Sequence, residues 1–461
     1  IKVVRDNDIM INEKIFKSYD IRGIYPAEIT GETACIVGKA LAKMFEAKKM
    51  AVGRDARLGS PELYEGLVRG LISQGVEVYD LGLVPIEAMY FAVGKYGYDG
   101  GVMVTASHNP KEYAGLKVVR KGVQMVRGKE ILEYIHQNDT SEVRPPREVE
   151  PHAGKVIQKE IKNEHIEHIL SFINTGALKP LKVVVDAGNG MAGQVVPILK
   201  QKLPFHIIEM NFEPDGNFPV HPSNPLEPES QKGIIEKVLE EKADMGVIFD
   251  GDADRMFFVD EKGRFLGSDP TICMLGRMML SKYPGAGIAF SAECGRIVPE
   301  KIKEWGGKPI RTPVGFVNVS DGMRREGGVM GGEYSAHYSF KDNFYADSGF
   351  IAFLLIAELV SKTGEPFSEM VKEFEVYARE PQLNLTIQNI PAVLGALKEE
   401  YNNGELDELD GVRVEYPDWW FIVRGSNTEP LLRVNIEADT KELLAEKKKE
   451  MLDFIRSITE N

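Results

Sequence analysis

Short apolar runs alternate with amphipathic segments along most of the 461-residue chain. The runs at 51–55, 76–82 and 100–106 are short and bounded by glycine or polar residues, so they predict buried strands. Between the first two, the segment 61–73 repeats apolar residues at helical spacing. Strands that alternate with helices in this way favour a largely parallel sheet with both faces covered.

The same alternation restarts after residue 154. A second stretch predicts strands at 181–186, 205–210 and 245–249, and helices at 194–201 and 231–242. A third stretch, from about residue 260, predicts a strand within 287–294 and helices near 298–305 and 348–362. We therefore expect three α/β units in succession.

From about residue 374 the pattern changes. Apolar and polar residues alternate with period two at 383–387, 412–425 and 431–438, and the chain ends in an amphipathic segment rich in lysine and glutamate. Period-two alternation is typical of antiparallel strands with one buried face. This part of the chain is predicted to form an α+β domain.

The expected fold class is therefore α/β, with three α/β domains that have mixed, largely parallel sheets and a C-terminal α+β domain. The polar, proline-containing stretch at 138–154 predicts the first boundary. The four predicted domains are 1–153, 154–259, 260–373 and 374–461.

Composition places the chain among ordinary globular proteins, with 43% hydrophobic and 27% charged residues. Its net charge of −14 repels polyanions, so we expect neither nucleic acid nor a membrane as a partner. A small anionic substrate would need a basic pocket or a metal ion to overcome this charge. The three cysteines form no CxxC pair, which argues against a disulfide framework and favours the cytoplasm. No apolar stretch is long enough to cross a bilayer.

The first motif that suggests chemistry is TASHNP, residues 105–110, within and after a predicted strand. Open α/β sheets bind ligands at the carboxyl ends of their strands, where the Ser107 hydroxyl would lie. His108 beside it could transfer a proton or bind a phosphate. Ser-His-Asn-Pro is also a good turn sequence, so a purely structural turn is the alternative.

The second motif is DGDADR, residues 250–255, after another predicted strand. Asp250, Asp252 and Asp254 can converge on one hard cation such as Mg²⁺. An EF-hand calcium loop is excluded, because Arg255 occupies the sixth position, where that loop needs glycine. An arginine beside the carboxylates suits a phosphate. The structural alternative is a solvated acidic turn.

The third motif is GGEYSAH, residues 331–337, whose glycines permit a sharp loop. Glu333, Ser335 and His337 alternate, and in an extended loop they would point the same way. A carboxylate, a hydroxyl and an imidazole side by side suit the recognition of sugar hydroxyls. A glycine-rich turn with a helix cap is the structural alternative.

The fourth motif is RGSNTEP, residues 424–430, in which an arginine and two hydroxyls accompany a tight turn, with Arg433 following. Such a set can cradle a phosphate, although a plain turn between strands has a similar composition. Two further cations stand in short motifs, Arg22 in YDIRG and Lys117 in GLK. Taken singly, each could be ordinary surface charge.

One segment points to a different chemistry. GNGMAG, residues 188–193, matches the G-x-G-x-x-G fingerprint of dinucleotide-binding sheets, and Glu209 lies about 20 residues after it, where an acid would bind the ribose. Asp186 before the first glycine and Pro197 within the following helix argue against this interpretation. The alternatives are an NAD site and a tight strand–helix turn.

Taken together, the motifs resemble those of the α-D-phosphohexomutase superfamily, most closely its phosphomannomutase/phosphoglucomutase members. YDIRG, TASHNP with GLK, DGDADR, GGEYSAH and RGSNTEP occur in family order over essentially the whole chain. PDGNFP at 214–219 and the turn at 312–315 are also similar to family sequences. The resemblance implies four domains around a central cleft, three of them related α/β domains and the last an α+β domain.

The resemblance also implies residue roles. Ser107 matches the serine that carries the phosphoryl group and supplies a further oxygen to the metal. Mg²⁺ would be bound by Asp250, Asp252 and Asp254. Sugar hydroxyls would contact Glu333 and Ser335, and the non-reacting phosphate would bind Arg424, Ser426, Asn427 and Thr428, with Arg433 close by. Arg22, His108, Lys117 and His337 match positions assigned to charge stabilisation and proton transfer, with Lys117 the first choice as general acid or base. Arg255 would bind the substrate and stabilise charge on the transferring phosphoryl group.

The implied activity is that of an isomerase of carbohydrate metabolism, a phosphoprotein that interconverts hexose 1-phosphate and hexose 6-phosphate. Mannose and/or glucose would be the sugar, a hexose 1,6-bisphosphate the intermediate and activator, and Mg²⁺ the cofactor. We expect a monomer or a homodimer. A phosphoglucosamine mutase is the nearest alternative. An NAD-dependent dehydrogenase, an Mg²⁺-dependent phosphatase and a sugar-phosphate sensor are the alternatives from other classes.

The chain departs from the family pattern at Glu293, where some phosphomannomutases have a lysine. If a cation is needed there, Arg296 or Arg311 would have to supply it. This leaves the third-domain contacts to the substrate open at the level of sequence.

Overall fold

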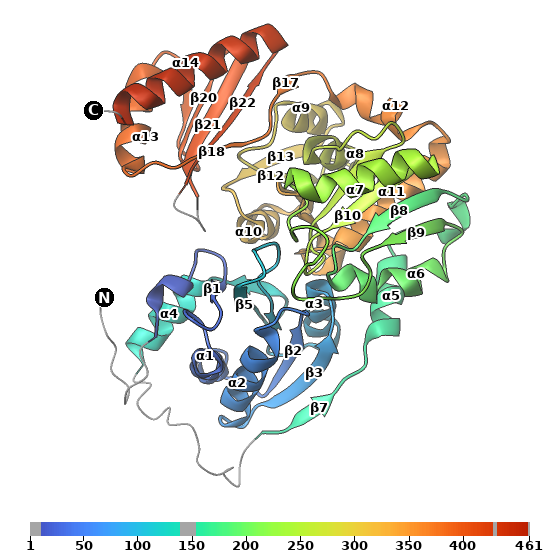
Figure 1. Ribbon diagram of the computed structural model, residues 1–461, viewed down its shortest axis with the longest axis vertical. Helices are drawn as coiled ribbons and strands as arrows, with labels where there is room; N and C mark the ends of the chain where they lie inside the picture. The colour runs from blue at the N-terminus through green and yellow to red at the C-terminus, as the bar shows by residue number, and fades with distance from the viewer. Residues whose placement is uncertain (1–10, 139–153, 427–430, 460–461) are drawn as a thin grey trace. The chain divides into compact units, whose positions relative to one another are not determined.

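The structure, a computed structural model, describes residues 11–138, 154–426 and 431–459 (Figure 1). The chain divides into two compact units. The first unit is Ile1–Gly267 with Ala336–Ser368, and the second unit is Ser268–Ser335 with Glu369–Asn461. The chain therefore leaves the first unit, returns to it, and leaves it again.

The first sheet of the first unit combines parallel and antiparallel strands. Its strands are β1 (Ile21–Ile24), β2 (Lys49–Arg54), β3 (Glu77–Leu83), β4 (Gly100–Val104), β5 (Tyr113–Arg120), β6 (Gln124–Val126) and β7 (Val156–Gln158). Its helices are η1 (Glu13–Ile15), α1 (Gly31–Met44), α2 (Ser60–Ile72), α3 (Ile86–Tyr96) and α4 (Gly128–Gln137). The strand order is β1-β5-β4-β2-β3-β7, with β6 paired to β5. Strands β4, β2, β3 and β7 run parallel, whereas β5 is antiparallel to both β1 and β4.

The second sheet of the first unit has the order β11-β10-β8-β9. Its strands are β8 (Lys182–Asp186), β9 (His206–Met210), β10 (Met245–Phe249) and β11 (Met256–Asp260). The accompanying helices are α5 (Lys162–Leu170), η3 (Thr175–Ala177), η4 (Met191–Gln194), α6 (Val196–Lys200) and α7 (Pro228–Glu241). Strands β10, β8 and β9 are parallel, and the hairpin partner β11 is antiparallel. Loops after parallel strands meet at one edge of this sheet, so the turn after β10 lies beside the turn after β8.

The returning segment adds a hairpin and a buried helix to the first unit. It contains β15 (Tyr338–Phe340), η5 (Lys341–Asn343), β16 (Ala346–Asp347) and α11 (Gly349–Thr363). Twelve of the fifteen α11 residues are buried, which fits a helix that is apolar on every side. Phe350 packs on Phe249 with ring centroids 5.0 Å apart, and Phe353 lies 6.4 Å from Phe205. Helix α11 is therefore part of the core of this unit.

The second unit contains a parallel α/β layer and an antiparallel sheet. The parallel strands are β12 (Gly287–Ser291), β13 (Lys308–Thr312) and β14 (Gly328–Gly332), with helices α8 (Ser268–Lys282), α9 (Ile297–Glu304) and α10 (Phe316–Glu326). The antiparallel strands are β17 (Ala378–Arg379), β18 (Leu383–Leu385), β19 (Glu405–Asp407), β20 (Val412–Glu415), β21 (Trp419–Gly425) and β22 (Leu432–Ala438). The remaining helices are η6 (Lys372–Phe374), α13 (Ile390–Glu400) and α14 (Lys441–Thr459), and α12 (Phe367–Val371) includes the point after Ser368 where the chain passes from the first unit to the second.

The antiparallel sheet of the second unit packs one face against helices and the other against residues of the parallel layer. Trp419, Phe421 and Val423 of β21 belong to the core that α13 and α14 complete. The intervening residues, which include Trp420 and Arg424, point to the other face because side chains alternate along a strand. Trp420 there packs in a small cluster that includes Ala292, from the loop after β12. Both faces are thus covered, the second one by residues of the parallel layer.

The predicted fold class is confirmed, since the chain has four α/β domains with mixed sheets and an antiparallel C-terminal sheet. The four predicted boundaries remain predictions, and the stretch proposed as the first boundary lies largely outside the described residues. The helix predicted at 194–201 is shorter than expected: η4 precedes α6, and proline occupies the first turn of α6. All three cysteines are free and buried. Within the described ranges, no helix is long and apolar enough to cross a membrane.

Candidate active site

Ser107 lies in the loop after β4 and is fully buried. Its φ is 51°, a left-handed conformation that is uncommon for a residue with a side chain. Its hydroxyl donates to Asp250 Oδ2 at 2.8 Å, and its backbone N–H donates to Thr105 Oγ1 at 2.9 Å. The strand end thus presents the serine hydroxyl directly to the aspartate loop.

The aspartate loop joins β10 to β11. Asp250, Asp252 and Asp254 have no exposed surface, and their ligand oxygens lie within 4.8 Å of one another. Burial, and then the neighbouring carboxylates, raise the pKa of Asp250 to about 7. Asp252 Oδ1 and Asp254 Oδ1 are buried and accept no hydrogen bond from the described residues. A buried acidic cluster with free oxygens suits a hard divalent cation.

Lys117, on β5, is the cation closest to this cluster. Its ammonium donates to Asp252 Oδ2 at 2.9 Å and to Asp254 Oδ2 at 2.6 Å. Burial alone would lower the pKa of Lys117, but the two carboxylates outweigh burial and raise it. The lysine is therefore held as an ammonium, in a form that can donate a proton or neutralise a phosphate.

Arg255 and His108 form a second cationic edge beside Ser107. Arg255 Nη2 is hydrogen-bonded to His108 Nδ1, and Arg255 Nε lies 3.6 Å from Asp250 Oδ2. His108 Nδ1 is 3.4 Å from Ser107 Oγ. Burial, and then the charges of Arg255 and Arg22, hold the pKa of His108 well below its ordinary value. His108 is thus a neutral imidazole at neutral pH.

Arg22, on β1, contacts the serine loop, which is residues 105–112 between β4 and β5. Its Nη1 donates to Ala106 O at 3.1 Å and to Asn109 Oδ1, and its Nε donates to Asp20 Oδ2 at 2.7 Å. Arg22 as a whole is 6% exposed. Asp20 fixes the orientation of Arg22, and Arg22 in turn contacts the loop that carries Ser107.

His337 closes the group from the returning segment. Its Nδ1 pairs with Asp347 Oδ2 at 2.5 Å and lies 3.8 Å from Asp254 Oδ1. Burial opposes protonation, but the carboxylates of Asp254 and Asp347 raise the pKa of His337 above its ordinary value. The first unit therefore brings together, in one contiguous group, nine of the residues singled out from sequence: Arg22, Ser107, His108, Lys117, Asp250, Asp252, Asp254, Arg255 and His337.

Sequence reasoning missed two residues that fix this group. Asp347 orients His337 and lies ten positions after it, beyond the GGEYSAH motif. Arg57 is fully buried, and its guanidinium donates to the backbone carbonyl of Ser107 in the serine loop. The order Asp55-Ala-Arg57 directly after β2 could have drawn attention, because residues at the carboxyl end of a central strand lie near the site.

The second unit holds the predicted sugar loop. Glu333 Oε1 accepts from Gly315 N at 2.6 Å, and Ser335 Oγ donates to Glu333 Oε2 at 2.8 Å. The condition that the loop be extended is not met: residues 334 and 335 form a turn, and the φ of Ala336 is 66°. Glu333 and Ser335 therefore bond to each other, while His337 bonds to Asp347 instead.

The predicted phosphate loop is also in the second unit. Arg424, on β21, is 2% exposed and pairs opposite Arg433 of β22. Ser426 N donates to Leu431 O at 2.8 Å. Asn427 and Thr428 lie outside the described residues. The two arginines therefore lie opposite each other on paired strands, one on each side of the predicted loop in the sequence.

Glu293 is the unexpected partner in this region. Arg424 donates to Glu293 Oε2 from Nε at 3.1 Å and from Nη2 at 2.7 Å, and both residues are buried. The two candidate replacement cations, Arg296 and Arg311, make their contacts with other groups. Arg296 donates to the carbonyls of Pro417 and Trp419, and Arg311 pairs with Asp407 and Glu415.

In the glycine-rich turn after β8, the carboxylate of Asp186 occupies the space inside the turn. Asp186 Oδ1 accepts from Gly188 N and from Asn211 Nδ2, both at 2.9 Å. A Cβ on Gly190 would lie 2.7 Å from Gly251 O, so the glycine lets this turn pack directly on the aspartate loop. The carboxylate fills the position that a pyrophosphate would need, which argues against a dinucleotide and favours the packing interpretation.

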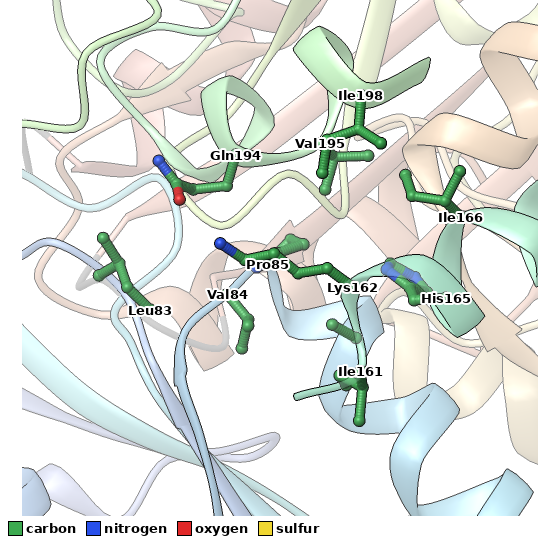
Figure 2. A pocket seen from close by; sticks show the side chains of 11 residues that line it. Leu83, Val84, Pro85, Ile161, Lys162, His165, Ile166, Gln194, Val195 and Ile198 are labelled. Carbon is green, nitrogen blue, oxygen red and sulfur yellow. The ribbon is translucent and has the colours of Figure 1, made fainter. Parts of the chain in front are cut away.

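A separate apolar crevice lies in the first unit, where the approach to α3 meets α5 and the turn of η4 and α6 (Figure 2). Aliphatic side chains such as Val84, Ile161 and Val195 line most of it. His165 is its buried titratable group, and burial lowers the pKa of His165 to about 3. None of the nine residues grouped around Ser107 lines this crevice, so it takes no part in the chemistry described above.

Comparison with known families matches most of the chain, in four segments, to one family. The phosphoglucomutase/phosphomannomutase models match as alpha/beta/alpha domain I at residues 13–142, domain II at 163–263 and domain III at 267–377, and as the C-terminal domain at 375–454. The order of the matches agrees with the motif order in the sequence.

Individual relatives agree with the family match. The chain is 39% identical over 425 residues to the phosphohexose mutases protein of Xanthomonas campestris pv. campestris, covering 92% of this chain and 94% of the relative. It is 36% identical over 440 residues to the phosphomannomutase/phosphoglucomutase of Pseudomonas aeruginosa, covering 93% of each chain. A crystal structure of a family protein from Burkholderia thailandensis shares 31% identity and a TM-score of 0.87, covering 97% of this chain and 98% of that one. The chain therefore belongs to the phosphoglucomutase/phosphomannomutase family and is a phosphohexomutase.

Proposed function

We propose that the enzyme interconverts hexose 1-phosphate and hexose 6-phosphate through a phosphoserine at Ser107 and a hexose 1,6-bisphosphate intermediate. Mannose and/or glucose is the proposed sugar. The observation that carries this proposal is the Ser107 hydroxyl, bonded to Asp250 beside two more buried carboxylates and Lys117. Phosphoryl transfer depends mainly on positioning and charge neutralisation, which such a group supplies.

The aspartate cluster fits Mg²⁺ by its chemistry. Asp250, Asp252 and Asp254 offer convergent carboxylates, and two of their oxygens are buried with no donor from the described residues. Bound there, Mg²⁺ would neutralise charge on the transferring phosphoryl group. Lys117 and Arg255 are the cations of the chain itself that reach the same cluster.

In the proposed transfer step, a sugar hydroxyl oxygen bonds to the phosphorus of phosphoserine, and the bond from phosphorus to Ser107 Oγ breaks. The sugar hydroxyl loses its proton and Oγ gains one. Neutral His108, 3.4 Å from Oγ, can accept a proton, whereas Lys117 as an ammonium can donate one. Lys117 remains our first candidate for the general acid, and reversal of the reaction makes it the base.

The bisphosphate formed in this step would turn around and return its other phosphate to Ser107. That reversal requires one distal phosphate site that accepts either end of the sugar. Arg424 and Arg433, with Ser426, Asn427 and Thr428, are the proposed site, and Glu333 with Ser335 would contact the sugar hydroxyls. Paired arginines bind phosphate oxygens with several parallel hydrogen bonds.

The names of the relatives support mannose and glucose as the sugar. The proteins at 35% to 39% identity are named phosphomannomutase or phosphohexose mutase, and one is named for both sugars. Solved N-acetylphosphoglucosamine mutases share only 13% to 14% identity and show the fold alone. Glucosamine 1-phosphate, the substrate of the phosphoglucosamine mutase alternative, is kept as the second candidate.

Phosphorus NMR tests the proposal directly. The enzyme is incubated with Mg²⁺, a trace of hexose 1,6-bisphosphate, and either mannose 1-phosphate, glucose 1-phosphate or glucosamine 1-phosphate. Growth of a 6-phosphate signal supports the mutase, and the relative rates identify the sugar. Release of inorganic phosphate alone would indicate a phosphatase and overturn the proposal.

The Ser107→Ala variant tests the phosphoserine. We expect turnover to fall by about 10⁴-fold or more, because the group that carries the phosphoryl is gone. Ser361→Ala, which alters another buried serine of the first unit, is the matched control and should keep its activity. Full activity in Ser107→Ala would exclude this mechanism.

A further inference from the structure

Arg57 gathers the backbone of the serine loop around one guanidinium. Its Nη2 donates to Ser107 O at 2.5 Å and to Asn109 O at 2.6 Å. Its Nη1 donates to Pro110 O at 2.8 Å and to Tyr113 O at 3.2 Å. The side chain is 1% exposed, so these four bonds replace water completely. Three of the four accepting carbonyls belong to the loop between β4 and β5, and the fourth, that of Tyr113, belongs to the first residue of β5.

Arg57 is itself fixed from two directions. Asp55 lies 3.4 Å from its Nε. From the segment between β9 and α7, the Phe218 ring stacks over the guanidinium with 4.9 Å to its centroid, and Ser223 Oγ lies 3.4 Å from Nη2. Ser223 Oγ also donates to Asn109 O at 3.2 Å. The same segment approaches so closely that a Cβ on Gly216 would lie 2.3 Å from the Ala56 carbonyl.

The serine loop needs such support because its conformation is strained. A residue with a Cβ in the left-handed region costs about 1–2 kcal/mol, and it persists only where surrounding contacts determine it. Ser107 has a φ of 51°, and the loop from 105 to 112 has no helix or strand to hold it. Arg57 supplies three bonds to carbonyls of this loop and a fourth to Tyr113, where the loop ends.

The same bonds orient a donor. A peptide group is planar, with its C=O and N–H on opposite sides. Because Ser107 O points to Arg57, the N–H of His108 points away from Arg57. That N–H has no acceptor among the residues that the structure describes. It is therefore available to a phosphoryl oxygen carried by the serine.

We propose that Arg57 is the positioning residue of the phosphoryl-carrying serine: its guanidinium holds Ser107 in the left-handed conformation and directs the His108 N–H away from itself, free for the phosphoryl group. This inference rests on the proposed phosphoserine mechanism. Arg57 acts through the loop and does not touch the transferring group. Phe218 and Ser223 keep the guanidinium in place.

Arg57→Lys separates geometry from charge. Lysine keeps the positive charge but has no planar fork, so it cannot reach four carbonyls at once. We expect kcat to fall by about 10²-fold, since misplaced reacting groups lose rate steeply, with KM for the hexose phosphate within about threefold. The rate at which sugar removes phosphate from phosphorylated Ser107, followed by intact-protein mass spectrometry, should fall by the same factor.

Leu71→Ala is the control for a merely structural loss. Leu71 is fully buried at the end of α2, and its truncation should cost about 2–5 kcal/mol and lower Tm. We expect it to keep its kcat. If Leu71→Ala at a comparable Tm loses as much kcat as Arg57→Lys, the effect of Arg57 is general destabilisation and the inference is overturned.

Phe218→Leu keeps the inference testable should Arg57→Lys not fold. Loss of the ring over the guanidinium should lower kcat by about fivefold and leave KM unchanged. Hydrogen exchange at residues 105–113 should accelerate in both variants. Wild-type kcat in these variants, or a change in KM alone, would overturn the role of Arg57. Absence of turnover in the wild-type enzyme would instead overturn the proposed function, while faster exchange would still show that Arg57 holds the loop.

Discussion

The serine–aspartate group of the first unit and the arginine site of the second unit both pair buried cations with carboxylates, but the partners differ. Around Ser107, each cation is paired with an aspartate of the group or with the serine loop, as Lys117 is with Asp252 and Asp254. In the second unit, Arg424 is paired with Glu293, whose charge has the same sign as a phosphate. The first group is already paired within itself, whereas a phosphate at the site proposed in the second unit would have to replace Glu293 as the partner of Arg424.

This difference assigns the two regions different energetic roles. Charges fixed in a buried group stabilise a transition state without reorganising when the reaction occurs. A buried ion pair that must open before ligand binding instead lowers affinity, because the ligand replaces an existing interaction. Variants of the first group should therefore change kcat, and a variant at Glu293 should change KM.

The largest effect is expected for Asp252→Asn. This change removes one carboxylate of the cluster and the charge that faces Lys117, so kcat should fall by about 10³-fold. Titration calorimetry should show weaker Mg²⁺ binding in the same variant. Asp244→Asn, at the exposed opposite end of β10, should leave both quantities unchanged. Equal Mg²⁺ affinity in Asp252→Asn would remove this aspartate from the metal site.

Next in size is Lys117→Met, which removes the ammonium and leaves two buried carboxylates unpaired. We expect kcat to fall by about 10²–10³-fold at saturating substrate, because general acid catalysis contributes on this scale. Lys121→Met, an exposed lysine just after β5, is the matched control. If Lys117→Met changes KM and leaves kcat intact, Lys117 is a binding residue and the first group is less specialised than the comparison holds.

Glu293→Gln should produce a smaller change of the opposite kind. With a neutral amide beside Arg424, a phosphate no longer competes with a carboxylate, so KM should fall by about fivefold while kcat stays within twofold. The variant should also lose about 3 °C in Tm, since a buried guanidinium has lost its counter-charge. Glu300→Gln, an exposed glutamate on α9, serves as the control. A rise in KM would mean that Glu293 positions Arg424 for the phosphate. It would contradict the idea that Glu293 competes with the phosphate.

The smallest expected effect is a decrease in the free energy of unfolding at acid pH. It should arise from histidines of the first unit. All eight histidines belong to the first unit. The pKa of His165 falls to about 3 because the ring is buried, so between pH 6.5 and 3 the unfolded chain binds one more proton than the folded chain. Stability therefore decreases as pH falls, with a contribution from His165 of about 2 kcal/mol at pH 5.

Urea unfolding with a probe in the first unit, at pH 7 and pH 5, measures this contribution. His165→Gln should reduce the difference between the two pH values by about 2 kcal/mol, whereas His206→Gln, at an exposed position on β9, should not. An unchanged pH dependence in His165→Gln would show that this ring is not buried as a neutral imidazole.

The sequence predicted secondary-structure elements and functional loops far better than it predicted which side chains contact one another. The spacing of apolar residues and the positions of turn residues located the strands. Because open α/β sheets bind ligands at the carboxyl ends of their strands, the loops that carry Ser107 and the three aspartates stood out as candidates. The NAD alternative was weakened from sequence by Asp186, and the structure shows this carboxylate capping the turn itself. These successes depend on local patterns of a few residues.

The partners that were missed depend on long-range contacts. Arg57 meets Ser107 across 50 positions, and Glu293 meets Arg424 across 131. A buried ion pair leaves no mark in one sequence, because each residue alone is typical of a surface. The replacement cation sought at Arg296 or Arg311 illustrates this, since the sequence gives no indication that both have other partners.

The return of the chain to the first unit has a practical consequence for fragments of this enzyme. A gene cut at the predicted boundary after residue 259 would encode both sheets of the first unit but not α11. Such a fragment would expose the surfaces around Phe205 and Phe249 that α11 covers, and it would lack His337 and Asp347. We expect it to aggregate, and a fusion that joins 336–368 back to it through a linker to be soluble. Expression design for this protein has to follow contacts in space and not the order of the domains along the gene.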